Sequence, residues 1–201
     1  LAECAELGGT CVNVGCVPKK LYSYAAGYAA AFEEAPGYGW TLPEAPRFDW
    51  ATLKRQRAQE ITRLNGVYQK LLDGAGVKTL TGWAQLVDGH TVSVSDTRYT
   101  ARHILVATGG MPAAPDMPGR ELAVVSDAMF DLPDFPKRLL VMGGGYIGCE
   151  FASLFRGLGA HVTLVNRGAH ILNGFDDDVR EALAREMGRQ GIDLRMTAQV
   201  E

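Results

Sequence analysis

The chain has little of what marks several large classes of protein. No apolar run approaches the ~18–20 residues that a membrane-spanning helix needs. Basic residues number 20 against 23 acidic ones, a net charge of −3, so no basic face for nucleic acid is indicated. Only four cysteines are present, which argues against the disulfide framework of a small secreted protein. We therefore expect a soluble, cytoplasmic protein with no nucleic-acid or membrane partner.

An initiator methionine and a signal peptide are also missing. The chain begins at Leu1, in what the pattern indicates is the end of a strand, and stops at Glu201 shortly after another strand. We therefore expect an internal segment of a longer protein. The remaining composition, 47% hydrophobic and 21% charged, is that of a globular chain with one or two domains.

Two of the cysteines lie close together in the segment GGTCVNVGCVPKK, residues 8–20. In a straight α-helix, Cys11 and Cys16 would have their Cα atoms roughly 8.7 Å apart. A disulfide needs about 4.4–6.8 Å. Gly15 accepts unusual backbone dihedrals and Pro18 lacks a backbone N–H, so the helix can be bent or tightened here. The segment therefore contains the distortion that a disulfide between these cysteines would require.

The spacing of the two cysteines leaves simpler interpretations open. One is a structural disulfide. The other is half of a zinc site, although zinc usually takes four ligands, and Cys4 and Cys149 offer no paired spacing to complete it. No metal is therefore predicted.

Hydrophobic periodicity predicts an α/β protein. Apolar positions recur every three or four residues in the expected helices and alternate or form short runs in the expected strands. Asp49 is a good N-cap for the second helix, and Gly74 ends that helix. In chain order, we expect helices at residues 17–35 and 49–72, strands at 79–99 about an Asp88-Gly89 turn, and strands at 103–107 and 138–142. A helix at 146–158, a strand at 161–165, a helix at 177–190 and a strand at 192–196 follow.

A glycine-rich motif, GGGYIG, occupies residues 143–148. This G-x-G-x-x-G match is weak alone, but here it follows a predicted strand and opens a predicted helix that leads to another strand. Its glycines let the backbone approach a pyrophosphate, and the helix N-terminus favours the negative charge. The motif therefore predicts a dinucleotide-binding site.

The cysteine segment resembles the redox-disulfide motif of the flavin-dependent pyridine nucleotide-disulfide oxidoreductases. Its Lys-Lys ending is most similar to that of glutathione reductases and their trypanothione-reducing relatives. The resemblance implies an α/β fold of two doubly wound, Rossmann-like dinucleotide-binding domains, the first lacking its N-terminal strand. Residues 1–112 would be a partial FAD-binding domain with the redox-active dithiol, and residues 113–201 a partial NAD(P)H-binding domain.

The same resemblance implies a homodimeric enzyme that passes electrons from NADPH through FAD and the dithiol to glutathione disulfide. Cys11 would attack the substrate and Cys16 would lie against the flavin. Lys19 and Glu150 would form an ion pair beside the flavin ring. The acid-base histidine of the family lies in a domain outside this chain, so we expect these residues alone to be inactive. A trypanothione- or lipoamide-type reductase, or a nucleotide-binding chain without turnover, remains the alternative.

The resemblance also assigns residues that contact the cofactors and the substrate. Glu3 would bind the FAD ribose, Tyr146 would cover the flavin until nicotinamide displaces it, and Tyr68 would contact the disulfide substrate. Tyr68 is equally well explained as a residue that packs its helix. The remaining cofactor contacts are expected at Gly9, Thr10, Lys19, Ala84, Thr108, Gly109, Gly143, Gly144, Gly145, Ile147, Gly148 and Glu150.

The choice of nicotinamide cofactor depends on the end of the strand at residues 161–165. NAD-preferring folds place a carboxylate there for the ribose 2′-OH, whereas NADP users place an arginine nearby. This chain has Asn166 followed by Arg167, and it has Asn173 where glutathione reductases usually carry a second arginine. We therefore predict an NADPH preference weaker than that of two-arginine relatives, unless Arg167 merely lies on a solvated surface.

Overall fold

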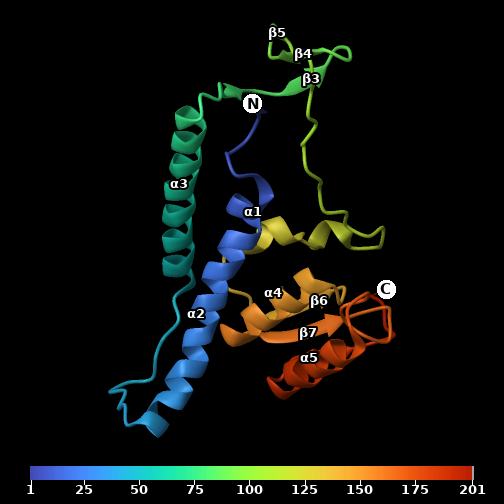
Figure 1. Cartoon of the computed structure of the whole chain (residues 1–201). Coiled ribbons are helices and arrows are strands. Elements are labelled where there is room, and N and C mark those ends of the chain that lie inside the picture. Colours follow the sequence, from blue (N-terminus) through green and yellow to red (C-terminus); the bar gives the residue numbers. More distant parts are fainter. Residues whose placement is uncertain (201) are drawn as a thin grey trace. The chain divides into compact units, whose positions relative to one another are not determined.

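The computed structural model describes residues 1–200 (Figure 1). Their contacts divide them into two compact units. The first unit comprises residues 1–19, 54–113 and 125–130. The second comprises residues 20–53, 114–124 and the chain from residue 131 onward. The predicted domain boundary at residue 113 remains a prediction, because the units are divided by packing and each combines separated stretches of chain.

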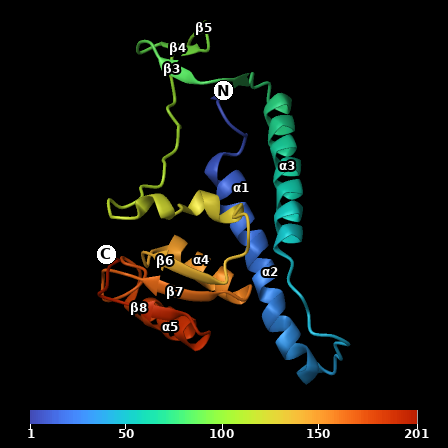
Figure 2. The ribbon, with the colours of Figure 1, turned by 180° about the vertical axis from the view of Figure 1, so that it is seen from behind.

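The second unit contains a parallel sheet with strand order β6-β7-β8 (Figure 2). Its strands and helices alternate along the chain, and α4 packs on β6 and β7 while α5 packs on β8. This is the predicted strand–helix–strand arrangement, and it confirms the α/β class. The elements are β6 (Arg138–Met142), α4 (Tyr146–Gly157), β7 (His161–Val165), α5 (Asp177–Arg189) and β8 (Asp193–Arg195).

The sequence explains why these elements form. Val162 and Leu164 alternate with more exposed residues along the central strand β7 and are 3% and 0% exposed. On α4, Phe151 and Phe155 recur at four residues and are buried. The side chain of Asp176 caps α5 by accepting hydrogen bonds from the backbone N–H groups of the helix's first turn.

The first unit contains a short parallel pair and an antiparallel meander. Strand β1 pairs with β2 in parallel, and β3, β4 and β5 form the antiparallel sheet, with the predicted Asp88-Gly89 turn between β3 and β4. Its elements are β1 (Ala2–Glu3), α1 (Gly9–Val14), β2 (Leu80–Thr81), β3 (Ala84–Leu86), β4 (Thr91–Val94), β5 (Thr97–Thr100) and the 3₁₀ helix η3 (Ser126–Phe130).

Two longer helices contribute to both units. Helix α2 (Cys16–Glu34) begins in the first unit and continues in the second, and α3 (Trp50–Gly74) does the reverse. The predicted N-cap of α3 is confirmed, since Asp49 Oδ1 accepts a hydrogen bond of 2.7 Å from the N–H of Thr52. The second unit also holds two 3₁₀ helices, η1 (Ala35–Tyr38) and η2 (Arg120–Leu122).

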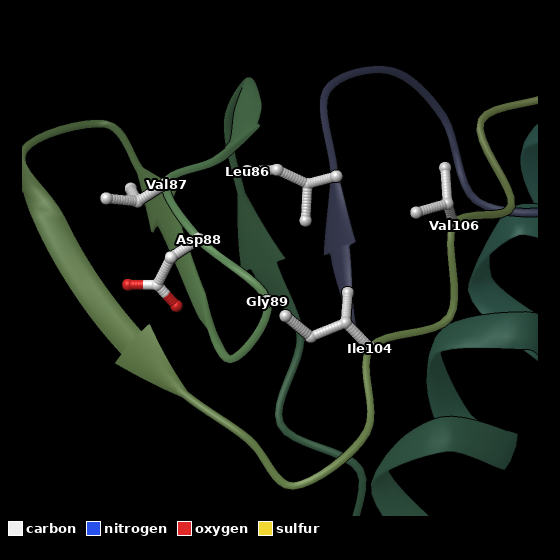
Figure 3. A pocket seen from close by; sticks show the side chains of 6 residues that line it. All are labelled: Leu86, Val87, Asp88, Gly89, Ile104 and Val106. Atoms are coloured by element: carbon white, nitrogen blue, oxygen red, sulfur yellow. The ribbon is translucent and has the colours of Figure 1, made fainter.

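The predicted strand at residues 103–107 is wrong. The segment forms no regular element, and Leu105 and Val106 are 90% and 60% exposed. Its composition is that of a buried strand, but a strand also needs a hydrogen-bonding neighbour. None of the strands that the structure describes pairs with it. Two of its members line an open cavity of about 360 Å³ beside the β3–β4 turn (Figure 3), whose walls are Leu86, Val87, Asp88, Gly89, Ile104 and Val106.

An aromatic cluster forms the core of the second unit where α2, the start of α3 and α4 meet. Trp50 makes an edge-on contact with Tyr22, with ring centroids 5.3 Å apart. It also contacts Phe135 and Phe155, at 5.7 and 5.9 Å, and these two phenylalanines stack on each other. The indole N–H of Trp50 donates to the carbonyl of Leu132, so its polar atom is satisfied.

We expect Phe155→Ala to lower the free energy of unfolding by about 3–5 kcal/mol, because the ring is fully buried among these aromatic side chains. Urea unfolding followed by far-ultraviolet circular dichroism measures this loss. Phe175→Ala is the matched control: this ring is 52% exposed, so the change should stay within about 0.5 kcal/mol. Equal losses for the two variants would contradict the assignment of this core.

Candidate active site

The cysteine segment is divided by a break at Gly15. Helix α1 ends at Val14 and α2 begins at Cys16, so the two cysteines lie on separate helices. A Cβ atom on Gly15 would lie 2.8 Å from the carbonyl oxygen of Thr10, closer than a side chain tolerates. Glycine therefore lets the backbone pass close to the Thr10 carbonyl at the point where α1 ends and α2 begins. The predicted distortion of the helix between the two cysteines is confirmed.

Both cysteine side chains are exposed and are present as free thiols. A side-chain hydrogen bond to Cys16 raises the pKa of the Cys11 thiol above its usual value. Partial burial and the charge of Cys16 add to this, while the positive charge of Lys19 lowers the pKa. Cys11 therefore stays largely protonated at neutral pH and becomes a thiolate as pH rises, so attack by Cys11 needs a base. The structure holds the dithiol form, and the disulfide form remains a prediction.

Two asparagines that sequence patterns do not identify, one inside this segment and one on α3, hydrogen-bond to it. Asn13 lies on α1 between the two cysteines, and Asn65 lies on α3. Their side-chain amides hydrogen-bond to each other over 2.9 Å. Both also donate to the carbonyl oxygen of Leu7. The one sequence feature that could have pointed to Asn13 is its position inside the cysteine motif. No feature of the sequence around Asn65 points to its contact with this segment.

The glycine-rich motif forms a tight loop between β6 and α4. The N–H of Gly143 donates to the carbonyl of Val165 at the end of β7 (2.8 Å). The side-chain oxygen of Asn166 accepts from the N–H of Gly144 (3.1 Å). A Cβ on Gly148 would lie 2.1 Å from the carbonyl oxygen of Gly143, so the helix begins close against the loop. This is the close helix–strand packing for which the last glycine of the motif is used.

The start of α4 suits a dinucleotide pyrophosphate. Its N-cap is Gly145, and no side chain caps it, so backbone N–H groups of the first turn can receive a ligand. Tyr146 and Ile147 in this turn are 59% and 44% exposed. The residues of the loop therefore fit the pyrophosphate that the motif predicts.

A second loop, residues 166–173, is fixed beside the glycine loop. The amide nitrogen of Asn166 donates to the carbonyls of Gly168 and His170, at 3.2 and 2.8 Å. The N–H of Leu172 donates to the carbonyl of Gly144, and Leu172 has a left-handed backbone with φ of 52°. Sequence patterns drew attention to Asn166 because it stands where NAD-preferring folds have a carboxylate. They did not predict that its side chain would hold this loop by hydrogen bonds.

The two residues predicted to choose the nicotinamide cofactor lie on this loop. Arg167 and Asn173 are both exposed. Between them the backbone is held by Arg180, whose Nε donates to the carbonyl of Ile171 (3.0 Å). The loop therefore presents two polar side chains on a fixed backbone next to the glycine loop.

The other predicted residues occupy scattered positions. Glu3 ends β1, and its carboxylate accepts from the N–H of Ala5 (3.0 Å). Tyr68 on α3 is 40% exposed. Lys19 and Glu150 belong to different units, so their ion pair remains a prediction. Exposed positions are found for Gly9 and Thr10 on α1, Ala84 at the start of β3, and Thr108 and Gly109 in the irregular segment.

Two further findings concern residues 1–200. Within this range, no three histidine, cysteine, aspartate or glutamate side chains gather in a way that could hold a metal ion. No helix in the same range combines the length and hydropathy needed to span a bilayer.

In air without reductant, we expect Cys11 and Cys16 to resist iodoacetamide because they are joined, and to react after reduction. Cys149 should stay unmodified at pH 8 in either state, because burial raises its pKa to about 11 and leaves about one thiol in a thousand ionised. Cys4 is exposed and should react throughout. Peptide mass analysis measures each site, and full reaction of Cys11 and Cys16 in air would contradict the redox pair.

Comparison with known proteins shows the family of this chain. Residues 2–201 match the family described as pyridine nucleotide-disulphide oxidoreductase. A glutathione reductase from Burkholderia cepacia is 46% identical over 200 residues, which cover 100% of this chain and 44% of that protein. A chloroplastic/mitochondrial glutathione reductase from Pisum sativum is 46% identical over 171 residues, which cover 85% of this chain and 31% of that protein.

A solved structure is also similar. The Cu(II) complex of the HOCl-induced flavoprotein disulfide reductase RclA from Escherichia coli matches with a TM-score of 0.83 at 26% identity, covering 100% of this chain and 44% of that one. The chain thus spans less than half the length of these relatives. Because the family match runs through both units, the chain belongs to the pyridine nucleotide-disulphide oxidoreductase family.

Proposed function

We propose that the protein containing this chain is a flavin-dependent reductase that passes electrons from NADPH through FAD and the Cys11/Cys16 dithiol to glutathione disulfide. The observation that carries the proposal is the pair of exposed, hydrogen-bonded thiols on either side of Gly15. The glutathione reductases at 44–46% identity support the choice of glutathione disulfide over other disulfides.

The dithiol would act by two exchange reactions. A base first removes the proton of Cys11, and the thiolate attacks one sulfur of glutathione disulfide. A mixed disulfide forms and one glutathione thiolate leaves. The proton taken from Cys11 passes to this leaving glutathione. Cys16 then loses its proton and attacks the Cys11 sulfur, which forms the Cys11–Cys16 disulfide, and the second glutathione leaves with that proton. The raised pKa of Cys11 explains why this sequence needs a base, and we place that base outside the present chain.

This chain would contribute residues to both cofactor sites. Bound FAD supplies the two-electron link between the nicotinamide and the disulfide. Glu3 would hold the FAD ribose, since it ends a strand in a parallel pair, where dinucleotide folds place such a carboxylate. The uncapped start of α4 would hold the NADPH pyrophosphate, with Tyr146 next to it. Lys19 and Glu150 would pair beside the flavin.

A second copy of the chain is the proposed partner, and the cytoplasm the proposed location. Helix α2 presents an exposed aromatic face on which Tyr28 and Phe32 stack with ring centroids 6.1 Å apart. Exposed apolar faces of this kind mark protein interfaces. The face therefore supports a homodimer.

In the full-length protein, Cys11→Ser should lower glutathione disulfide turnover by about three orders of magnitude or more, because the hydroxyl cannot form the mixed disulfide. Turnover is followed as NADPH consumption. Cys4→Ser removes an exposed thiol outside the pair and should leave the rate unchanged. Full activity in Cys11→Ser would exclude the proposed role. A wild-type protein that binds both nucleotides but turns over no disulfide would favour the nucleotide-binding alternative.

Arg167→Ala should lower the ratio of kcat/KM for NADPH to that for NADH by about tenfold or more, since a charge-assisted contact contributes roughly 1.5–3 kcal/mol. Asn173→Arg should raise the same ratio by adding a second cation on the fixed loop. Arg185→Ala removes an exposed arginine that pairs with Glu181 on α5, and it should change nothing. An unchanged ratio in Arg167→Ala would rule out this cofactor assignment.

A further inference from the structure

A closed hydrogen-bond network ties the first cysteine helix to α3. The amide nitrogen of Asn13 donates to the carbonyls of Gly9 (2.9 Å), Leu7 (3.2 Å) and, more weakly, Glu6 (3.4 Å). The amide nitrogen of Asn65 donates to the carbonyl of Leu7 (2.7 Å) and to the side-chain oxygen of Asn13 (2.9 Å). Both hydrogens of the Asn65 amide are therefore used, and only a side chain with two donors can make both contacts.

Besides this network, helix α1 packs mainly on the short 3₁₀ helix η3 among the element contacts of the described residues. Helix α1 has six residues, and helices this short are unstable alone. Its N-cap is Gly8, which has no side chain to cap it, and Val12 is its one buried residue. The partner in the network is α3, a helix of 25 residues. The two hydrogen bonds from Asn65 therefore make α3 one of the elements that orient α1, and with it the Cys11 sulfur.

We propose that Asn13 and Asn65 are positioning residues that hold Cys11 within reach of Cys16 and so set the equilibrium between dithiol and disulfide. Neither side chain is assigned a chemical step. They act by removing freedom from α1, since Gly15 would otherwise let α1 and α2 move independently. The inference rests on the proposed function only in treating the two cysteines as a redox pair.

The equilibrium concerned is the exchange of the dithiol with glutathione disulfide. Two thiols and one glutathione disulfide give the Cys11–Cys16 disulfide and two glutathiones, so atoms and electrons balance. Its equilibrium constant measures the effective concentration of one protein thiol at the other. When α1 can move, Cys11 spends less time near Cys16, so the effective concentration of one thiol at the other falls. A tenfold loss corresponds to a disulfide potential about 30 mV less negative.

The test is Asn65→Asp in the full-length protein. This change keeps the size and an acceptor but removes both donors. Gln69→Glu is the matched control: it is the same amide-to-acid change one turn further along α3, where the amide donates to Asp73 of the same helix (2.8 Å). Each variant is equilibrated in glutathione redox buffers and alkylated, and the Cys11 and Cys16 peptides are quantified. We expect the equilibrium constant to fall about tenfold in Asn65→Asp and to stay at the wild-type value in Gln69→Glu.

A further variant and the melting temperature complete the test. Asn65→Ser keeps one donor, should give an intermediate equilibrium constant, and replaces the aspartate variant if that one does not fold. A lower melting temperature with an equilibrium constant within about twofold of wild type would overturn the proposal, because the network would then serve stability alone. An equal change in Gln69→Glu would overturn it too, by showing a charge effect. The measurement needs no turnover, so it stands even if glutathione disulfide proves not to be the substrate.

Discussion

The close approach of the Thr10 carbonyl to the backbone of Gly15 is the constraint on which the dithiol depends. A side chain at this position would meet that oxygen at 2.8 Å and push the two cysteine helices apart. With glycine, α1 can stop and α2 can start within a single residue. This places the two sulfurs on successive helices, α1 and α2, where one thiol hydrogen-bonds to the other. The chemistry of the pair follows from that backbone contact.

Both sites use a short amide side chain to fix a loop. An asparagine offers a donor and an acceptor without a charge, so it can take the place of missing backbone partners. Asn13 does so beside the cysteines, and Asn166 does so beside the glycine loop. At the second site the neutral side chain has another effect. A carboxylate there would take a ribose hydroxyl and repel a 2′-phosphate, whereas Asn166 leaves Arg167 as the nearest charge in sequence.

Local patterns predicted most of the second unit because its signals are local. Strands β6 and β7 lie at the predicted residues, and α4 and α5 each end one residue before the predicted end. The segment at residues 103–107 shows the limit of such patterns, since its apolar run specifies burial but cannot supply a neighbouring strand. The bond from Asn65 to Leu7 spans 58 residues, and no period in the sequence encodes it. Roles such as those of Tyr68 and Tyr146 came from resemblance alone.

The construction of the loop at residues 166–173 bears on how such a protein can change over evolution. Its backbone is held by Asn166, by Arg180 and by the glycine loop, and none of these contacts involves the side chains of Arg167 or Asn173. Exposed substitutions that break no such contact usually change stability by less than about 0.5 kcal/mol. Selection can therefore alter the charge of this loop without a second substitution that restores lost stability. With the proposed roles of Arg167 and Asn173, coenzyme preference is a trait that can drift by single substitutions, while the scaffold beneath it stays the same.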